Sequence, residues 1–228
     1  FEEARAAGDQ LVYISLSSAL SGTYQCAAVV KAMGEYDNVH LVDSRSATLG
    51  QKLLVLHAVS LRDQGFSAEE IASRLTALRS RIRIYAGLDT LEYLQKGGRL
   101  SKTAAGLGTL ARIKPVVTIT QEGTVAVAGK CLGRTKAMSQ IAALLEAAPP
   151  DPEFPLLGVY GGSTENLTAL RLRLQQKGFV IPQDQCFSLG PVIGAHIGPG
   201  AYGAAFCGAL SYSFVSSSLR NAKNRCPR

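Results

Sequence analysis

Short apolar runs alternate with amphipathic stretches over the first third of the chain, and this alternation restricts the fold more than any other feature. The runs 11–15 and 39–42 have the length and apolar content of buried strands. A helical pattern over 18–33, ended by Gly34, separates them, and two more helical patterns follow. Apolar strands that alternate with amphipathic helices are typical of parallel βαβ units. We therefore predict an α/β fold with a parallel βαβ first domain over residues 1–80.

The pattern changes near residue 82, where β-rich runs replace the regular alternation. We predict a strand over 82–88 and a hairpin whose strands, 115–120 and 124–128, are joined by the turn Gln121-Glu122-Gly123. Helices are predicted over 101–112, 135–148 and 163–176. This mixture predicts an α+β second domain over 81–210, with a mixed or antiparallel sheet. Residues 211–228 have no periodicity, and we expect a disordered or non-native tail there.

The composition is that of a globular protein, and it disfavours several classes of function. No apolar run reaches the length of a transmembrane helix and no secretory signal opens the sequence, so we expect no integral membrane association. Five cysteines without CxxC spacing favour a reducing, cytoplasmic location. The net charge is +7, but residues 211–228 carry four basic residues and no acids, which leaves +3 for the rest. Because aromatic residues are also sparse, we predict no nucleic-acid partner.

A glycine-rich segment, GPVIGAHIGPGAYG at 190–203, holds a single histidine among apolar residues. Glycine lets the backbone approach a ligand closely, and proline restricts the path of the chain. His196 is therefore a candidate polar group in an apolar binding site, although a histidine in such surroundings is more often a core residue. The other two histidines, His40 and His57, lie within strand and helix patterns. Three scattered histidines have no metal-ligand spacing, so we predict no metal site.

A second segment, Ser17 to Tyr24, has complementary chemistry. Its hydroxyl groups precede a helical pattern, and the free amides and the dipole at a helix N-terminus favour an anion. Serine and threonine at a helix start are also ordinary caps. This segment by itself supports both interpretations equally.

Two glycine turns each place an arginine in front of a helical pattern. Arg99 follows Gly97-Gly98, and Arg134 follows Gly133. Solvated surface residues and contacts to an anion or an acidic partner are both compatible with these arginines. The sequence contains no GxxxxGK[ST], GxSxG or HExxH motif, and we assign no catalytic residue.

Five motifs that occur in a fixed order connect these segments to a known family. Together they resemble the DegV family of bacterial fatty-acid-binding proteins, and they extend along nearly the whole chain up to about residue 208. The motifs are ISLSSALSGTYQCA (14–27), LVDSRSATLGQ (41–51), LDTLEYLQKGGRLSKTAAGLGTLARIKPVVTI (88–119), GKCLGRTKA (129–137) and GPVIGAHIGPGAYGAAF (190–206).

The resemblance implies a two-domain α/β protein that buries a fatty acid between its domains. It further implies a non-catalytic subunit, without a cofactor, that presents the acyl carboxylate to a separate ATP-dependent fatty acid kinase. By motif position, Ser17, Ser18 and His196 are implied as carboxylate contacts. Arg99 and Arg134 are implied at the pocket mouth or on the partner surface.

The chain differs from this family at both ends. Family members have an N-terminal strand with a TDS-like motif and a later TSQPS-like loop, whose threonine also helps to bind the carboxylate. Neither motif occurs ahead of Phe1, so we expect an N-terminally truncated and incomplete first domain. An enzymatic alternative, a small-molecule phosphotransferase or a lipid hydrolase that uses the same pocket, stays open.

Overall fold

The structure is a computed structural model, and it describes residues 1–100 and 112–210. Its helices are α1 (Glu2–Ala7), α2 (Thr23–Met33), α3 (Thr48–Asp63), α4 (Ala68–Leu78), α5 (Glu92–Lys96), α7 (Arg134–Ala147), α8 (Glu165–Gln175) and α9 (Pro191–Ile197). Its strands are β1 (Leu11–Ser15), β2 (Val39–Asp43), β3 (Ile82–Gly87), β4 (Ile113–Ile119), β5 (Val125–Leu132), β6 (Leu157–Tyr160), β7 (Cys186–Ser188) and β8 (Tyr202–Cys207).

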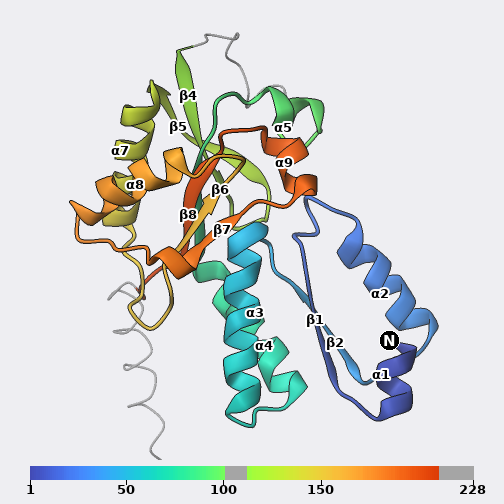
Figure 1. Ribbon diagram of the computed structural model, residues 1–228. Helices are drawn as coiled ribbons and strands as arrows, with labels where there is room; N and C mark the ends of the chain where they lie inside the picture. Colours follow the sequence, from blue (N-terminus) through green and yellow to red (C-terminus); the bar gives the residue numbers. More distant parts are fainter. Residues whose placement is uncertain (101–111, 211–228) are drawn as a thin grey trace, which may run out of the picture.

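The first part of the chain forms a small parallel sheet. β1 pairs with β2 in parallel, with Leu11 opposite Val39 and Ser15 opposite Asp43, and α2 lies between the two strands in sequence. Parallel strands cannot be joined by a tight turn, so the connection needs a crossover such as a helix. Figure 1 shows this unit in blue, with α2 alongside the two strands. The predicted parallel βαβ unit is confirmed.

The helix α2 begins later than the sequence pattern predicts. The pattern starts at Ser18, whereas α2 begins at Thr23. Two amides beyond Ser17 donate to its carbonyl at 3.0 and 3.1 Å, and the amide of Ala19 donates to its hydroxyl at 3.3 Å. Serine side chains that bond to nearby backbone compete with helix formation. Residues 17–22 therefore form a turn in front of the helix.

The second part of the chain forms a six-stranded mixed sheet in the order β5-β4-β3-β8-β6-β7. Neighbouring strands are antiparallel, except for the parallel pair β6 and β7. β4 and β5 form the predicted hairpin. The mixed sheet beside a parallel βαβ unit confirms the predicted α/β fold class.

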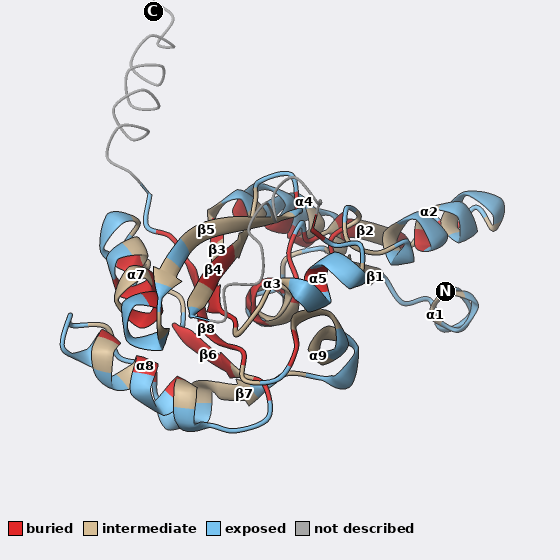
Figure 2. Cartoon of the chain, turned by 90° about the horizontal axis from the view of Figure 1, so that it is seen from above, coloured by how far each residue is buried: buried red, intermediate tan, exposed pale blue. Residues whose placement is uncertain are grey.

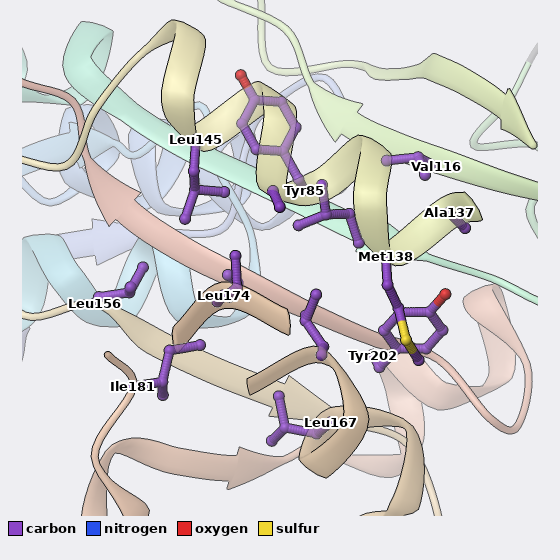
Figure 3. Close-up of a cluster of buried hydrophobic side chains, with 14 of the residues drawn as sticks. Tyr85, Val116, Ala137, Met138, Leu145, Leu156, Leu167, Leu174, Ile181 and Tyr202 are labelled. Carbon is purple, nitrogen blue, oxygen red and sulfur yellow. The ribbon is translucent and has the colours of Figure 1, made fainter. Parts of the chain in front are cut away.

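Helices cover both faces of the six-stranded sheet (Figure 1). On one face, α7 and α8 pack around Tyr202 and Phe206 of β8. Figure 3 shows Tyr202 within this cluster. On the other face, α3 and α4 pack around Ile84 and Ala205. Successive strand residues point to opposite faces, so β8 contributes to both cores and all of its residues are buried. Figure 2 shows these buried residues between the layers.

The amphipathic helix α4 has the cap that its sequence predicts. The hydroxyl of Ser67 accepts from the amide of Glu70, and the Glu70 carboxylate accepts from the amide of Ser67. This reciprocal pair is a capping box. The helix then buries Ile71, Leu75 and Leu78.

The glycine-rich segment contains a helix that the sequence pattern did not predict. α9 follows Gly190 and begins with Pro191, and proline suits the first position of a helix. The chain then turns through Gly198 and Gly200, at φ values of 78° and 76°. The short strand β7 was also missed. Residues 101–111 of the helix predicted over 101–112, and the predicted tail 211–228, lie outside the described residues.

None of the helices in the described ranges is long and apolar enough to cross a membrane. The predicted division into domains at residue 80 stays a prediction. The core between α3, α4 and the six-stranded sheet includes residues from both sides of that position, such as Leu53 and Val159.

The buried hydroxyl of Tyr202 leads to a prediction about stability. Tyr202 is 1% exposed, and its hydroxyl has no hydrogen-bond partner among the described residues. Burial raises the pKa of Tyr202 to about 12. An unpaired buried polar group costs about 1–3 kcal/mol. We therefore expect Tyr202→Phe to raise the free energy of unfolding in urea by about 1 kcal/mol.

The control is Tyr85→Phe, because Tyr85 lies in the same core but its hydroxyl is not a buried, unpaired group. This variant should leave the free energy of unfolding nearly unchanged. A clear loss of stability in Tyr202→Phe would show that the hydroxyl is satisfied in solution.

Candidate functional site

A cavity of about 150 Å³ brings together segments that are far apart in the sequence. It is lined by the loop between β1 and α2, the start of α3, the strands β3 to β6 and the helix α9. The walls are mostly aliphatic, with Leu16, Leu20, Ile84, Val117, Ile119 and Val159 among them. Among the described residues, the polar ones in the lining are Ser21, Thr48, Arg99, Thr118 and His196.

His196 lies on α9 and lines this cavity. Its position depends on close packing between α9 and α5, which lie next to each other in Figure 1. A methyl group on Gly97, at the end of α5, would lie 2.3 Å from Nδ1 of His196. A methyl group on Gly198 would likewise lie 2.4 Å from the ring of Tyr93. Glycine at both positions therefore lets the histidine reach the cavity.

Arg99 lines the same cavity and connects two of its walls. Its Nε donates to the carbonyl of Leu20 at 3.2 Å, and its Nη1 donates to the carbonyl of Gly97 at 2.6 Å. Leu20 precedes Ser21 in the loop before α2, and Gly97 packs on His196. Arg99 therefore links the Leu20–Ser21 loop to the end of α5 that packs on His196, and Ser21, Arg99 and His196 all line the cavity.

Ser17 and Ser18 belong to the loop that forms one wall, but neither lines the cavity. The hydroxyl of Ser17 donates to the carbonyl of Gly123 at 2.8 Å. The hydroxyl of Ser18 donates to the carboxylate of Asp43 at 2.6 Å, and its amide donates to the same carboxylate at 3.1 Å. Their role as carboxylate contacts stays a prediction.

The interaction with Ser18 changes the ionisation of Asp43. Burial acts to raise the pKa of this carboxyl group, but hydrogen bonds from the hydroxyl and amide of Ser18 and from the amide of Arg45 outweigh it, and the pKa is lowered. Asp43 is therefore a charged acceptor at the end of β2, and it holds the serine loop through two hydrogen bonds.

Arg134 lies outside the cavity lining, at the start of α7. Its guanidinium binds the carboxylate of Asp89 with three contacts of 2.8 to 3.1 Å, and Lys114 reaches the same carboxylate at 2.9 Å. Burial acts to raise the pKa of Asp89, but the bonds from Arg134 and Lys114 lower it overall. The arginine side chain is 48% exposed, so it remains accessible on the surface.

Thr48 also lines the cavity, although nothing in the sequence singled it out, and Ser21 lines it as well. Thr48 begins α3 and has a φ of 47°, a conformation that is rare for a β-branched residue. No local sequence signal predicts a left-handed threonine, because only the surrounding packing can impose it. Ser21 belongs to the serine segment that was singled out, but the sequence did not show which of its serines would line the cavity.

This arrangement suits an amphipathic molecule with an acidic head. Aliphatic walls favour a hydrocarbon chain, and an arginine, a histidine and a hydroxyl can donate to a carboxylate or a phosphate. The residues that the structure describes contain no group of three or more His, Cys, Asp or Glu side chains that could hold a metal ion.

Comparison with known sequences places a family model over most of the chain. The model described as "Uncharacterised protein, DegV family" matches residues 1–209. A DegV domain-containing protein from Clostridium perfringens is 32% identical over 213 residues, which cover 91% of this chain and 73% of the relative. A DegV domain-containing protein from Caldanaerobacter subterraneus is 34% identical over 211 residues, which cover 90% and 73%.

Comparison with solved structures agrees. A DegV family protein from Thermus thermophilus, described with fatty acid binding, superposes with a TM-score of 0.78 at 33% identity and covers 90% of this chain and 74% of its own. A fatty acid binding DegV family protein from Streptococcus agalactiae has a TM-score of 0.79 at 23% identity, with coverages of 91% and 74%. At 23% identity, the similarity to the Streptococcus agalactiae protein shows a shared fold.

Proposed function

This chain belongs to the DegV family, and from that premise we propose that it binds a long-chain fatty acid in the cavity described above. Fatty acid binding is a described property of DegV family proteins. The acyl chain lies between the aliphatic walls, and the carboxylate lies beside Ser21, Arg99 and His196. The observation that carries the proposal is an apolar cavity whose lining includes three polar residues from distant segments, Ser21, Arg99 and His196, with Arg99 hydrogen-bonded to two of these segments.

The energetics favour this division of roles. Burial of about 15 methylenes contributes roughly 12 kcal/mol, at about 0.8 kcal/mol per methylene, before association costs of roughly 4–15 kcal/mol. Affinity must therefore come mainly from the hydrocarbon. The carboxylate still needs hydrogen bonds, because a buried charge without partners is costly. Within the serine loop we assign that contact to Ser21, since Ser17 and Ser18 donate their protons inside the protein. The hydroxyl of Ser21 lies 2.7 Å from the hydroxyl of Thr23, where either group can donate, so its proton is not committed to a buried acceptor.

The cavity is small compared with a long acyl chain. A cavity of about 150 Å³ holds a molecule of roughly the size of benzene. A long acyl chain needs considerably more room, and we propose that the cavity walls move apart when the ligand binds. The segments that join the walls therefore influence how the ligand enters and leaves.

We further propose that the bound carboxylate is presented to a separate ATP-dependent fatty acid kinase in the cytoplasm. In this scheme the chain supplies binding and orientation, and the kinase supplies the phosphoryl-transfer chemistry. Arg134 supports this role because it is fixed by Asp89 yet half exposed, which suits a contact to an acidic surface of a partner. Arg99 supports the same role because it lines the cavity in which we place the carboxylate.

The test is a binding measurement on His196→Ala. A hydrogen bond to a charged group contributes about 1.5–3 kcal/mol, so we expect the affinity for palmitate to fall by roughly tenfold or more. Affinity for hexadecanol, which has no carboxylate, should change little. Isothermal titration calorimetry can measure both ligands.

The matched control is His40→Ala, because His40 lies on β2 and does not line the cavity. It should bind palmitate as the unchanged protein does. If His196→Ala also keeps full affinity for palmitate, the histidine does not hold the carboxylate. Turnover of ATP or of an ester by the protein without any partner would instead support an enzymatic function.

A further inference from the structure

The hydroxyl of Ser17 connects two walls of the cavity that are far apart in the sequence. Ser17 is fully buried, and its Oγ donates to the carbonyl of Gly123, in the turn between β4 and β5, at 2.8 Å. Its amide donates to the carbonyl of Ser46 at 2.8 Å. A serine hydroxyl has a single proton to donate. Ser17 therefore donates its one hydroxyl proton to the carbonyl of Gly123.

Gly123 is adapted to this contact. It is buried and has a φ of 83°, a conformation that favours glycine. A methyl group at this position would lie 2.2 Å from Oγ of Ser17 and 3.2 Å from Cα of Arg45. Both the backbone conformation and the space therefore require glycine for the contact to form.

Further hydrogen bonds hold the same turn against the first part of the chain. Nη1 of Arg45 donates to the carbonyl of Gln121 at 3.4 Å, and the side-chain amide of Gln121 donates to the carbonyl of Ser80 at 2.9 Å. The strands on either side of the turn contribute Ile119 and Val125 to the cavity. The turn therefore holds one apolar wall against the loop that forms another.

We propose that Ser17 is a positioning residue that, through Gly123, ties the loop 16–21 to the β4–β5 turn and thereby controls how far the cavity walls part for an acyl chain. The inference rests on the proposed fatty acid binding, since the ligand is what parts the walls. It assigns to Ser17 a role different from direct contact with the carboxylate. We call the Ser17–Gly123 contact the latch.

The first test needs no ligand. Hydrogen–deuterium exchange is measured on the full chain for the unchanged protein, Ser17→Ala and Gly123→Ala. Loss of the latch should raise exchange about tenfold in both peptides, 16–21 and 119–125, in either variant. Gly178→Ala is the control, because Gly178 has a nearly identical φ of 84° and open space around a methyl group. It should leave both peptides unchanged.

The second test separates positioning from carboxylate contact. A fluorescent C16 acid and the matching C16 alcohol are bound, and their release to phosphatidylcholine vesicles is followed by stopped flow. If Ser17 acts through the latch, Ser17→Ala should release both ligands faster by the same factor, about tenfold. If Ser17 instead holds the carboxylate, only the acid will leave faster, and the proposal is wrong.

A double variant tests whether the two residues act through one contact. Ser17→Ala with Gly123→Ala should release ligand no faster than the faster single variant, because the same bond is lost. If the two substitutions multiply each other's effect on the rate of ligand release, the latch proposal is wrong. If Gly123→Ala does not fold, Ser17→Ala alone still decides both measurements.

These experiments distinguish a failure of the latch from a failure of fatty acid binding. If the unchanged protein binds neither C16 ligand, the proposed function fails, and the exchange experiment still decides whether the two segments are coupled. If it binds both but exchange rises only in the mutated segment, fatty acid binding stands and the latch does not.

Discussion

Ala47→Phe is expected to weaken fatty acid binding by about 100-fold while the protein stays folded. Ala47 lines the cavity at the start of α3 and is 6% exposed. Its backbone is extended, with φ −144° and ψ 169°, a conformation that phenylalanine adopts readily. The substitution adds a benzene ring to a cavity that holds roughly one benzene-sized molecule.

The magnitude follows from the hydrocarbon that the ring displaces. Loss of room for about four methylenes, at about 0.8 kcal/mol each, removes roughly 3 kcal/mol, which corresponds to about 100-fold in Kd. Calorimetry with palmitate measures this loss. Ala47→Val should give a smaller loss in the same direction, and thermal unfolding should show that each variant is folded. Full affinity in Ala47→Phe would place the acyl chain elsewhere.

Gly203→Ala is expected to be the most destabilising single-methyl change in the sheet. Gly203 lies opposite Ala86 in the pairing of β8 with β3. A methyl group there would lie 2.4 Å from the carbonyl oxygen of Tyr85 and 2.9 Å from Cα of Ala86. Both neighbours are backbone atoms in a central strand pair, so no side-chain rotation can relieve the overlap.

Overpacking of a core commonly costs about 1–3 kcal/mol, and a backbone clash falls at or above the upper end of that range. We expect Gly203→Ala to lower the free energy of unfolding by about 3 kcal/mol or more, and to lower Tm by roughly 6–12 °C. Differential scanning calorimetry measures the change. Gly161→Ala is the control, since its methyl group would meet neighbours at 3.5 Å and beyond, which is ordinary contact. Equal stability of the two variants would contradict the packing of β3 against β8.

Local patterns predicted most of the fold because they depend on neighbouring residues. The apolar run at 11–15 became β1, the capping residue Ser67 began α4, and Gly123 lay in the turn of the predicted hairpin. α9 escaped prediction because its glycines argue against a helix. The turn before α2 was also missed, since its serines were assigned to the helix start, whereas Ser17 accepts hydrogen bonds from the amides just beyond it.

Local sequence patterns also predicted part of the candidate site. His196 and Arg99 were singled out by their glycine-rich surroundings, and both line the cavity. Arg134 was singled out on equal grounds, does not line the cavity and binds Asp89, and its place at the pocket mouth or on a partner surface stays a prediction. The sequence patterns around Arg99 and Arg134 are similar, and only their long-range partners differ.

The order of apolar runs and turns was enough to predict an α/β fold, and five motifs in a fixed order resembled the DegV family. Both conclusions depend on residue types at short spacings, which the sequence shows directly. Only the tertiary structure decided which serine lines the cavity and which one bonds to the turn between β4 and β5. The role of Ser17 depends on its hydrogen bond to Gly123, 106 positions away. It also depends on the left-handed backbone of Gly123, which the packing imposes. Contacts of such sequence separation are formed by the fold as a whole, so no segment encodes them alone.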